Sequence, residues 1–444
     1  MPGTPATASA PDHVTPYDRF AWSDATVGEW LASGEHRAEL SAYFGATEYR
    51  ELKALARRAQ RTPPAAADAS VIVVPGIMGS QLGIRRTPPL PDDIVWIDPI
   101  DIQHGRLRAL RVGAAARIVP LGVVLFSYLR LKLHLRARGF AAEFYDYDWR
   151  LSAAELGRAF AEHLRRHPAA RLSVVAHSLG GLVTRAALAQ PGTQKVARVI
   201  LLGTPNQGSY AAVQALRGTD AVVRKVARLA PVDSAETLAA DVYSGFASLY
   251  DLLPAGSART ALFDAAAWPR TGPQPRAALL AAACAERERL APGDARFVTI
   301  AGFGEETVTA VARRGDDFHY TITRAGDGTV PAASAALAGA RGFFAPTAHS
   351  NLTRDPQVAA AVVDLLRRGV TQRLAEHWRG ASRAQAQVSD AQLRRTHAHK
   401  VDWATLSPEE RRVFLQNLNE PTSLKLRVPG KRTQDKPRRT RARR

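Results

Sequence analysis

The sequence predicts an α/β protein in which a mostly parallel central sheet carries helices on both faces, with a helical cap or lid inserted. Short apolar runs of strand length alternate with longer helical patterns, and each run ends in a loop that contains Gly, Pro, Asp or His. This alternation is typical of parallel strands joined by crossover helices. Six runs are expected to form the strands, namely Ser70–Val74, Ala142–Tyr147, Leu172–Ala176, Val199–Gly203, Phe297–Ala301 and Gly342–Ala345.

The N-terminal part of the chain stands apart from this alternation. Residues 1–16 are rich in Pro, Ala, Thr and Ser, which predicts a flexible lead. Residues 17–60 carry apolar side chains at roughly helical spacing, and the Pro/Ala-rich stretch Thr62–Ala67 follows them. We therefore expect residues 1–68 to comprise a flexible lead and a helical N-terminal extension.

The alternating region predicts one large domain over residues 69–372. Between Gly208 and about Asp294 the alternation gives way to Ala-rich helical segments and Pro-containing loops. This change predicts the inserted cap or lid at residues 209–294, and a helix after Asn351 is expected to close the domain. Functional loops are expected at the carboxyl ends of the strands, where open parallel sheets bind their ligands.

The C-terminal part, residues 373–444, is predicted to be a polar helical segment followed by a basic disordered tail. Ser407-Pro408-Glu409 has the composition of a helix start. From Lys431 onward the tail holds eight basic residues and one acidic residue, so it supplies +7 of the formal net charge of +19. This charge is compatible with peripheral contact with an anionic membrane, but it does not by itself choose that partner over others. Nucleic acid or an acidic partner would respond to the same field, and a solvated tail that binds nothing is an equal alternative.

Cysteine usage and hydropathy bear on the compartment. Cys284 is the only cysteine and lies in a helical pattern, so no intramolecular disulfide can form. The first twenty residues lack a basic stretch followed by an apolar core, and no signal peptide is recognised. The longest apolar run, Ile118–Leu129, is too short to span a bilayer. A cytoplasmic protein without a transmembrane helix is the expectation.

The sharpest local pattern is the segment LSVVAHSLGGLVTRAAL, in which an apolar strand is followed by a tight turn and an apolar helix. Ser178 lies in the turn, with Ala176 two residues before it and Gly180 two residues after it. Small residues at these positions permit the strained connection known as the nucleophile elbow, which lifts a serine hydroxyl clear of the sheet. Ala176 replaces the usual first glycine, and a Gly-rich turn without chemistry is the alternative interpretation.

A serine hydroxyl is a weak nucleophile, so it needs a base and a carboxylate that orients the base. Asp327 lies in the Gly-flanked loop RAGDGTVP, and His349 follows the last apolar run in PTAHSNL. The order Ser178, Asp327, His349 is that of α/β-hydrolases, and we predict these three as the catalytic triad. Asp316 and Asp317 are weaker alternatives for the acid. Taken singly, an Asp-Gly turn or a packed histidine would explain each residue without catalysis.

The reaction also needs two backbone donors for a developing oxyanion. Leu179, directly after the serine, is predicted to supply one of them. In SVIVVPGIMGSQL, Pro75-Gly76 turns the chain and leaves the amide of Ile77 free to supply the other, although an ordinary Gly-rich loop is the alternative. The sequence has no zinc-ligand spacing, Walker loop or dinucleotide glycine pattern, so no metal or cofactor is expected.

Six motifs together resemble the lecithin:cholesterol acyltransferase family: VVPGIMGSQL, YDYDWR, VVAHSLGGLV, GTPNQGS, AGDGTVP and AHSNL, in this order. They cover about residues 70–370, and the heavy use of Arg and Ala suggests a bacterial member. The resemblance implies an α/β-hydrolase that takes an acyl chain from a glycerolipid onto its serine and passes it to water or an alcohol. It places the triad and the oxyanion donors on the residues named above. Tyr147–Arg150 matches the YDWR motif, which we expect to support the site structurally.

The chain differs from the animal members because it lacks a disulfide-closed lid and a recognisable secretory signal. These differences and the bacterial composition favour a phospholipid, a neutral lipid or a smaller ester as substrate. Val95–Pro99 (VWIDP) is a candidate start of a substrate-side loop.

Three functions are compatible with the sequence. We expect an O-acyltransferase or carboxylic ester hydrolase of the lipase or phospholipase A type, acting in lipid metabolism. A soluble carboxylesterase for short acyl chains is the nearest alternative. A noncatalytic binding protein on a hydrolase scaffold, using its positive charge to hold nucleic acid or an acidic polymer, is a third, but the complete triad speaks against it.

Overall fold

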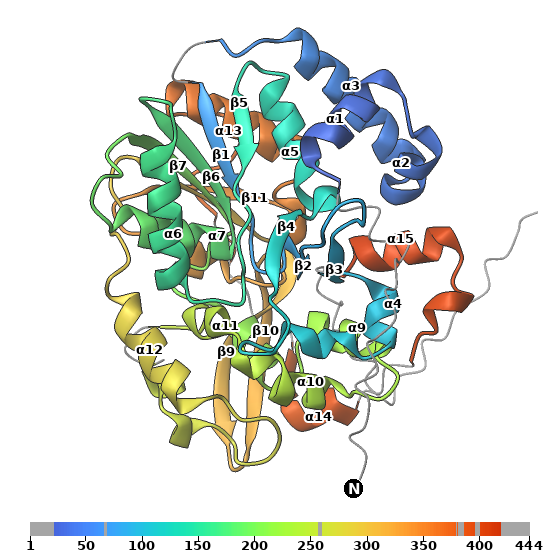
Figure 1. The fold of residues 1–444 in the computed structure, drawn as a ribbon. Helices are drawn as coiled ribbons and strands as arrows, with labels where there is room; N and C mark the ends of the chain where they lie inside the picture. Colours follow the sequence, from blue (N-terminus) through green and yellow to red (C-terminus); the bar gives the residue numbers. More distant parts are fainter. Residues whose placement is uncertain are drawn as a thin grey trace, which may run out of the picture.

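The computed structural model describes residues 22–65, 69–255, 260–378, 380, 386–395 and 400–418. Within these residues a six-stranded parallel sheet forms the centre of the molecule (Figure 1). The six apolar runs of the sequence form its strands, so the predicted α/β fold is confirmed. The spatial order is β11 (Arg341–Ala345), β8 (Phe297–Gly302), β7 (Val196–Leu202), β6 (Leu172–His177), β1 (Ser70–Val74) and β5 (Ala141–Phe144).

Helices cover both faces of this sheet. Successive side chains of a strand point to opposite faces, so Val71 and Val73 belong to one apolar core while Ile72 and Val74 belong to another. Burial on both faces explains why the strands are continuous apolar runs and not alternating ones. The covering helices are α5 (Leu125–Arg136) and α13 (Pro356–Arg368) on the first face, and α6 (Ala153–Arg166) and α7 (Leu179–Leu188) on the second.

The residues between β7 and β8 form short helices, in the region where the cap was predicted (Figure 1). Side chains at three helix starts cap them, because Ser209, Asp220 and Ser234 each accept hydrogen bonds from first-turn amides. Cys284 lies exposed on the last of these helices. In chain order they are α8 (Tyr210–Leu216), α9 (Ala221–Leu229), α10 (Ala235–Asp241), α11 (Ala247–Asp251) and α12 (Ala277–Arg287).

Two smaller antiparallel sheets in the described residues were not predicted. One orders β3 (Asp93–Trp96), β2 (Ser80–Ile84) and β4 (Val119–Val123). The other orders β12 (Ala386–Ser389), β10 (Asp317–Gly326) and β9 (Glu305–Arg314). The prediction that residues 373–444 begin with a helical segment is wrong at β12, which is a strand because the edge of β10 offers it backbone partners.

The N-terminal extension packs on the central domain as helices α1 (Asp24–Ser33), α2 (Arg37–Phe44) and α3 (Ala46–Arg61). Their apolar side chains share a core with α5, and Arg130 of α5 forms ion pairs with Glu48 and Glu51 of α3. The remaining α-helices described are α4 (Pro99–Gln103), α14 (Asp390–Arg395) and α15 (Pro408–Gln416).

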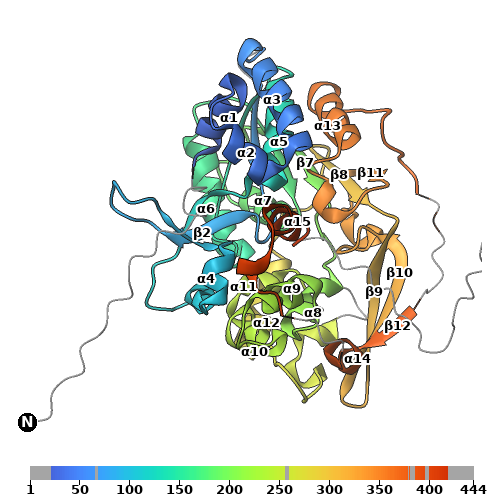
Figure 2. The same ribbon diagram turned by 90° about the vertical axis from the view of Figure 1, so that its right-hand side faces the viewer.

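The C-terminal segment runs back across the molecule. Its helix α15 lies beside α2 (Figure 2), where the Gln416 side-chain amide donates to the Phe44 carbonyl. The helix start predicted at Ser407 is confirmed, because Ser407 and Glu410 form a reciprocal capping box. Lys400 donates to three backbone carbonyls at the end of α9 and in the turn that follows, those of Ala227, Ala230 and Asp233. This segment therefore ties the cap to the N-terminal helices.

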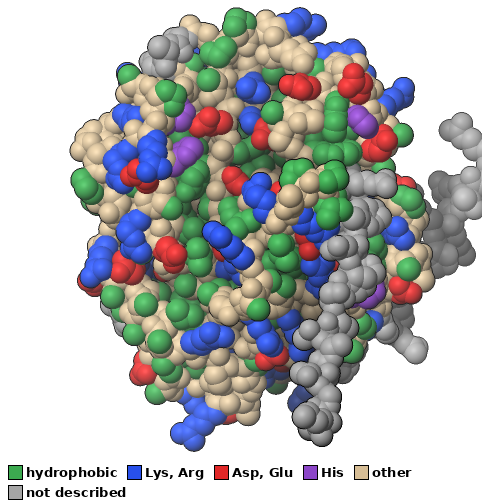
Figure 3. Space-filling model, viewed as in Figure 1, with side chains coloured by type: hydrophobic (Ala, Val, Ile, Leu, Met, Phe, Trp, Pro, Cys, Tyr) green, Lys and Arg blue, Asp and Glu red, His purple; other side chains and the backbone are tan. Residues whose placement is uncertain are grey.

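In the described part of the chain no helix combines the length and the apolar character needed to cross a membrane. On the face seen in Figure 3, Lys and Arg side chains are scattered among Asp and Glu side chains and do not gather into one patch. The predicted flexible lead and the basic tail from Lys431 onward lie outside the described residues.

Candidate active site

Ser178 occupies the sharp turn between β6 and α7, with φ 54° and ψ −125°. A non-glycine residue rarely adopts a positive φ, and such strain is held only where the surroundings enforce it. The surroundings here are tight. A Cβ on Gly180 would lie 2.3 Å from the Pro75 carbonyl oxygen, and a Cβ on Gly181 would lie 2.0 Å from Thr204 Oγ1. The two glycines therefore let α7 start directly against the ends of β1 and β7, which aims the serine hydroxyl outward.

The structure brings Ser178, His349 and Asp327 together by hydrogen bonds. His349 Nε2 lies 2.9 Å from Ser178 Oγ, and His349 Nδ1 lies 2.8 Å from Asp327 Oδ2. Asp327 is fully buried, and its other carboxylate oxygen accepts the amides of Thr329 and Val330. The His349 amide also donates to the Asp327 carbonyl at 2.9 Å. Asp327 and His349 are thus held together through both backbone and side chain.

The alternative acids lie elsewhere. Asp316 and Asp317 lie at the opposite end of β10 from Asp327. The Asp316 carboxylate accepts the amides of Arg270 and Thr271, and the Asp317 carboxylate accepts the amide of Ala391. These contacts hold loops of the cap and the C-terminal segment, so neither aspartate serves His349.

The two predicted oxyanion donors lie on either side of Ser178. Leu179 is the first residue of α7, so its amide has no acceptor within the helix. Ile77 lies in the turn between β1 and β2 and lines the same cavity as Ser178. This turn is pressed against the serine, because a Cβ on Gly76 would lie only 2.8 Å from Ser178 Cβ. We call residues 75–80 the oxyanion loop.

Aromatic residues hold the oxyanion loop from behind. Tyr147 Oη donates to the Pro75 carbonyl at 2.7 Å, and Trp149 Nε1 donates to the Ser80 carbonyl at 3.0 Å. Trp96 Nε1 donates to the Met78 carbonyl at 3.0 Å. The YDWR motif therefore supports the site structurally, as expected. VWIDP does so as well through Trp96, none of its residues lines the cavity, and its role as the start of a substrate-side loop stays a prediction.

A cavity of about 120 Å³ opens at Ser178 and extends beneath the cap. Its walls are mostly apolar, with Ala212 and Ala215 from α8, Val223 from α9, and Leu249 and Leu252 from α11 and its end. Apolar pockets of this kind, with a few convergent polar groups at one end, suit an apolar ligand that carries one reactive polar group.

Asp220 and Tyr128 are polar residues of the cavity wall that the sequence did not single out. Asp220 caps α9 by accepting the amides of Val222 and Val223, and burial raises the pKa of its carboxyl. Tyr128 comes from α5, inside the apolar run that the sequence singled out only for its length. No local pattern marks either residue, since their place in the cavity depends on how distant helices pack. Among the described residues, no group of three or more His, Cys, Asp or Glu side chains is arranged to hold a metal ion.

Comparison with known families adds an independent finding. The model of the family described as Lecithin:cholesterol acyltransferase matches residues 134–272. The resemblance to that family is confirmed. The matched stretch includes the YDWR motif, the turn at Ser178 and most of the helices between β7 and β8.

Solved structures that include a lipase and a carboxyl esterase are similar to this chain. The mature Bacillus licheniformis lipase BlEst2 shares 16% identity, with 68% of this chain and 94% of that chain covered and a TM-score of 0.37. The metagenomic carboxyl esterase MGS0156 shares 14% identity, with 69% and 78% covered and a TM-score of 0.37. A chain of the Tle4-Tli4 complex shares 13% identity, with 68% and 99% covered and a TM-score of 0.38. These similarities concern the fold alone, and no curated protein sequence matches.

Proposed function

We propose that this protein is a serine-dependent acyl hydrolase or O-acyltransferase that acts on lipid esters. One observation carries the proposal, namely the hydrogen-bonded series Ser178, His349, Asp327 at the mouth of an apolar cavity. The family match over residues 134–272 supports the same class of substrate.

The first half of the reaction forms an acyl-enzyme. Ser178 Oγ attacks the ester carbonyl while His349 Nε2 takes the hydroxyl proton, and Asp327 stabilises the resulting imidazolium through Nδ1. The tetrahedral oxyanion accepts hydrogen bonds from the Ile77 and Leu179 amides, and such preorganised donors are worth about 3 kcal/mol each. His349 then protonates the leaving alcohol as the ester bond breaks, and the acyl chain stays on Ser178.

The second half releases the acyl chain to water or to an alcohol. His349 takes a proton from the incoming hydroxyl, whose oxygen attacks the acyl-enzyme, and returns the proton to Ser178 Oγ. The apolar walls of the cavity provide room for the acyl chain beside the reacting carbonyl. A soluble short-chain carboxylesterase would use the same steps, so the length of the preferred chain separates these two functions.

Contact with an anionic membrane is part of this proposal. The segment from Lys431 to Arg444 carries a charge of +7 and would raise the residence time of the enzyme on such a surface. A tail-truncated chain should then lose activity on anionic vesicles but keep its activity on a dispersed short-chain ester.

Product analysis with acyl-labelled phospholipid vesicles that contain an alcohol acceptor tests the proposal. Ser178→Ala should abolish label release while the far-UV circular dichroism stays unchanged. The matched control is Ser173→Ala, on the same strand but outside the cavity, and it should retain the rate. Serine-dependent label in a new ester would establish an acyltransferase, and label only in free fatty acid would establish a lipase or phospholipase. Equal release by the wild type and Ser178→Ala, on vesicles and on short esters, would refute the mechanism.

A further inference from the structure

A buried chain of hydrogen bonds joins the two halves of the site behind Ser178. The amide of Gly76 donates to Tyr128 Oη at 2.8 Å. Tyr128 Oη lies 2.9 Å from His177 Nδ1, and His177 Nε2 lies 3.1 Å from the carbonyl oxygen of His349. Both bridging side chains are buried, with Tyr128 3% and His177 7% exposed. The chain therefore runs from the oxyanion loop to the backbone of the histidine that contacts Ser178.

The two ends of this chain determine where its protons lie. A backbone N–H can only donate and a carbonyl oxygen can only accept, so Tyr128 accepts from Gly76 and His177 Nε2 carries a proton toward His349. A neutral imidazole that is protonated at Nε2 has an acceptor at Nδ1. The Tyr128 hydroxyl therefore donates its proton to His177 Nδ1. Every donor in the chain then has one acceptor. Burial, and next the proximity of His349, holds the pKa of His177 well below its usual value, which agrees with a neutral ring.

This assignment excludes direct chemistry by either bridging residue. Both nitrogens of His177 are engaged, so it cannot serve as a second base for Ser178. Tyr128 lines the cavity, but its hydroxyl proton points to His177 and is not free for an oxyanion. The pair can instead fix the position of the oxyanion loop relative to His349. Gly76 directly precedes Ile77 in that loop, and the ring centroids of His177 and His349 lie 4.7 Å apart.

We propose that Tyr128 and His177 are positioning residues that hold the oxyanion loop and His349 in register around Ser178. The inference rests on the proposed acyl-transfer function, in which Ile77 supplies an oxyanion donor and His349 acts as the base. Small displacements of such groups weaken the transition state more than they weaken substrate binding. The expected signature is therefore a loss in kcat with little change in KM.

Tyr128→Phe is the central test, because it removes one hydroxyl and leaves the ring in place. We expect kcat on a dispersed nitrophenyl ester to fall about 10- to 100-fold, with KM within about 2-fold of the wild type. Tyr243→Phe is the matched control, since Tyr243 is also buried but its hydroxyl has no hydrogen-bond partner in the described structure. That control should keep the wild-type kcat.

A transition-state analogue separates positioning from general destabilisation. An alkylboronic acid forms a tetrahedral adduct with a serine hydroxyl, so its Ki should rise in Tyr128→Phe in proportion to the fall in kcat/KM. The Ki of a product fatty acid, which makes no such adduct, should stay within about 2-fold. A variant that merely unfolds in part would lose both kinds of binding equally, and that result would overturn the positioning role.

Variants of His177 provide a second, independent measure. His177→Gln keeps a side-chain N–H that can reach the His349 carbonyl, so it should lose less activity than His177→Ala. Because the two residues act through one chain, Tyr128→Phe combined with His177→Ala should cost no more than His177→Ala alone. Multiplicative losses would overturn the proposal.

The same assay distinguishes failure of the inference from failure of the function. A rate that depends on Ser178 and is equal in Tyr128→Phe and Tyr243→Phe would refute the positioning role alone. A wild-type rate no higher than that of Ser178→Ala would refute the acyl-transfer function, and the positioning role would fall with it.

Discussion

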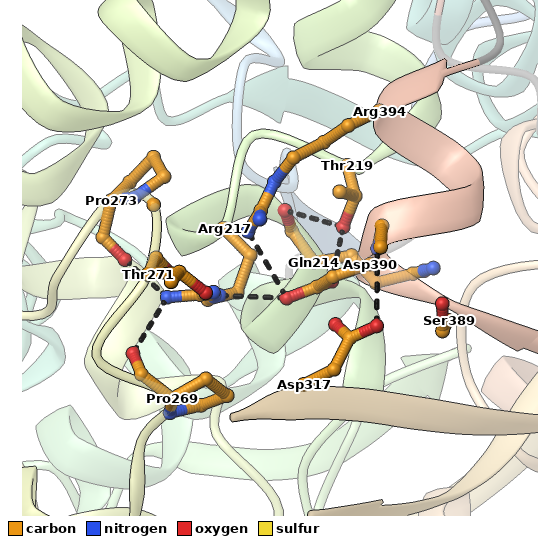
Figure 4. A network of polar contacts seen from close by, with 12 residues as sticks. Gln214, Arg217, Thr219, Pro269, Thr271, Pro273, Asp317, Ser389, Asp390 and Arg394 are labelled. Carbon is orange, nitrogen blue, oxygen red and sulfur yellow. Dashed lines mark hydrogen bonds and ion pairs between the residues drawn. The ribbon is translucent and has the colours of Figure 1, made fainter. Parts of the chain in front are cut away.

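Asp390→Ala should destabilise the protein more than any surface substitution, because this carboxylate anchors the C-terminal segment inside the cap. Asp390 is fully buried at the start of α14. Its carboxylate accepts from Arg217 Nε at 2.7 Å, Tyr320 Oη at 2.6 Å, Thr219 Oγ1 at 3.2 Å and Arg394 Nη2 at 3.3 Å. Figure 4 shows Arg217 between this carboxylate and the loop that carries residues 269–273. The network thus joins the cap, strand β10 and the C-terminal segment.

The magnitude follows from what the substitution leaves behind. Removing one partner of a buried ion pair typically costs about 3–5 kcal/mol, because the remaining charge stays buried. Arg217 would keep three acceptors, the carbonyls of Pro269, Thr271 and Pro273, which places the ion-pair loss near the lower limit. Tyr320 loses the carboxylate that accepts its hydroxyl proton, which adds about 1 kcal/mol. We expect a loss of about 4 kcal/mol in the free energy of unfolding.

Denaturant unfolding followed by circular dichroism measures this loss. Glu162→Ala is the matched control, because Glu162 forms ion pairs with Arg165 and Arg166 on the surface of α6. Exposed pairs of this kind contribute little to stability because water and salt screen them. The loss of stability in Asp390→Asn should lie between those of Asp390→Ala and Glu162→Ala, since Asn keeps a hydrogen-bond acceptor but removes the charge. If Asp390→Ala were no less stable than Glu162→Ala, the reasoning about the buried pair would be refuted.

Three further predictions concern the elbow, the pH dependence of stability and the cavity. Gly181→Ala should lower the free energy of unfolding by about 1–3 kcal/mol in denaturant melts, because the new Cβ would lie 2.0 Å from Thr204 Oγ1. Adding Thr204→Gly should restore part of this stability, and a double variant that is no more stable than Gly181→Ala would contradict this cause. Burial raises the pKa of Asp251 from 3.8 to about 7, so the folded state holds a proton on this carboxyl that the unfolded state has already released. The resulting stabilisation is fully present below pH 4 and is lost as the pH rises to about 7. Relative to Asp251→Asn, the wild type should therefore lose roughly 4 kcal/mol between pH 4 and 8 in the same melts, and a pH-independent difference would refute the assignment. Ala215→Phe narrows the cavity, so the ratio of rates on long-chain and short-chain esters should fall at least about 10-fold, and an unchanged ratio would show that the acyl chain lies elsewhere.

Much of the fold and the site could be predicted because the relevant information is local. A strand buried on both faces needs a continuous apolar run, as in Ser70–Val74, whatever its neighbours are. The tight turn at Ser178 needs small residues beside the serine. The sequence therefore pointed to Ser178, Asp327 and His349, three residues whose side chains lie within hydrogen-bond distance in the folded chain.

Other features left little trace in the sequence. The alternation of residues 305–326 around Gly315 is a hairpin signal that could have been recognised, because it follows from the two-residue period of a strand. The strand Ala386–Ser389 could not, since its four residues become a strand only through pairing with β10. Short segments have weak intrinsic preferences, and a tertiary partner decides their conformation.

The sequence by itself determined the alternation of strands and helices, the turn at Ser178 and the order of the residues around it, because each depends on the period and size of neighbouring side chains. Only the tertiary structure decided that Tyr128 reaches His177 and that Arg217 meets Asp390, 173 residues further along the chain. A buried polar side chain needs a partner, but its own neighbours in sequence do not specify which one. That choice is made when the helices and strands pack.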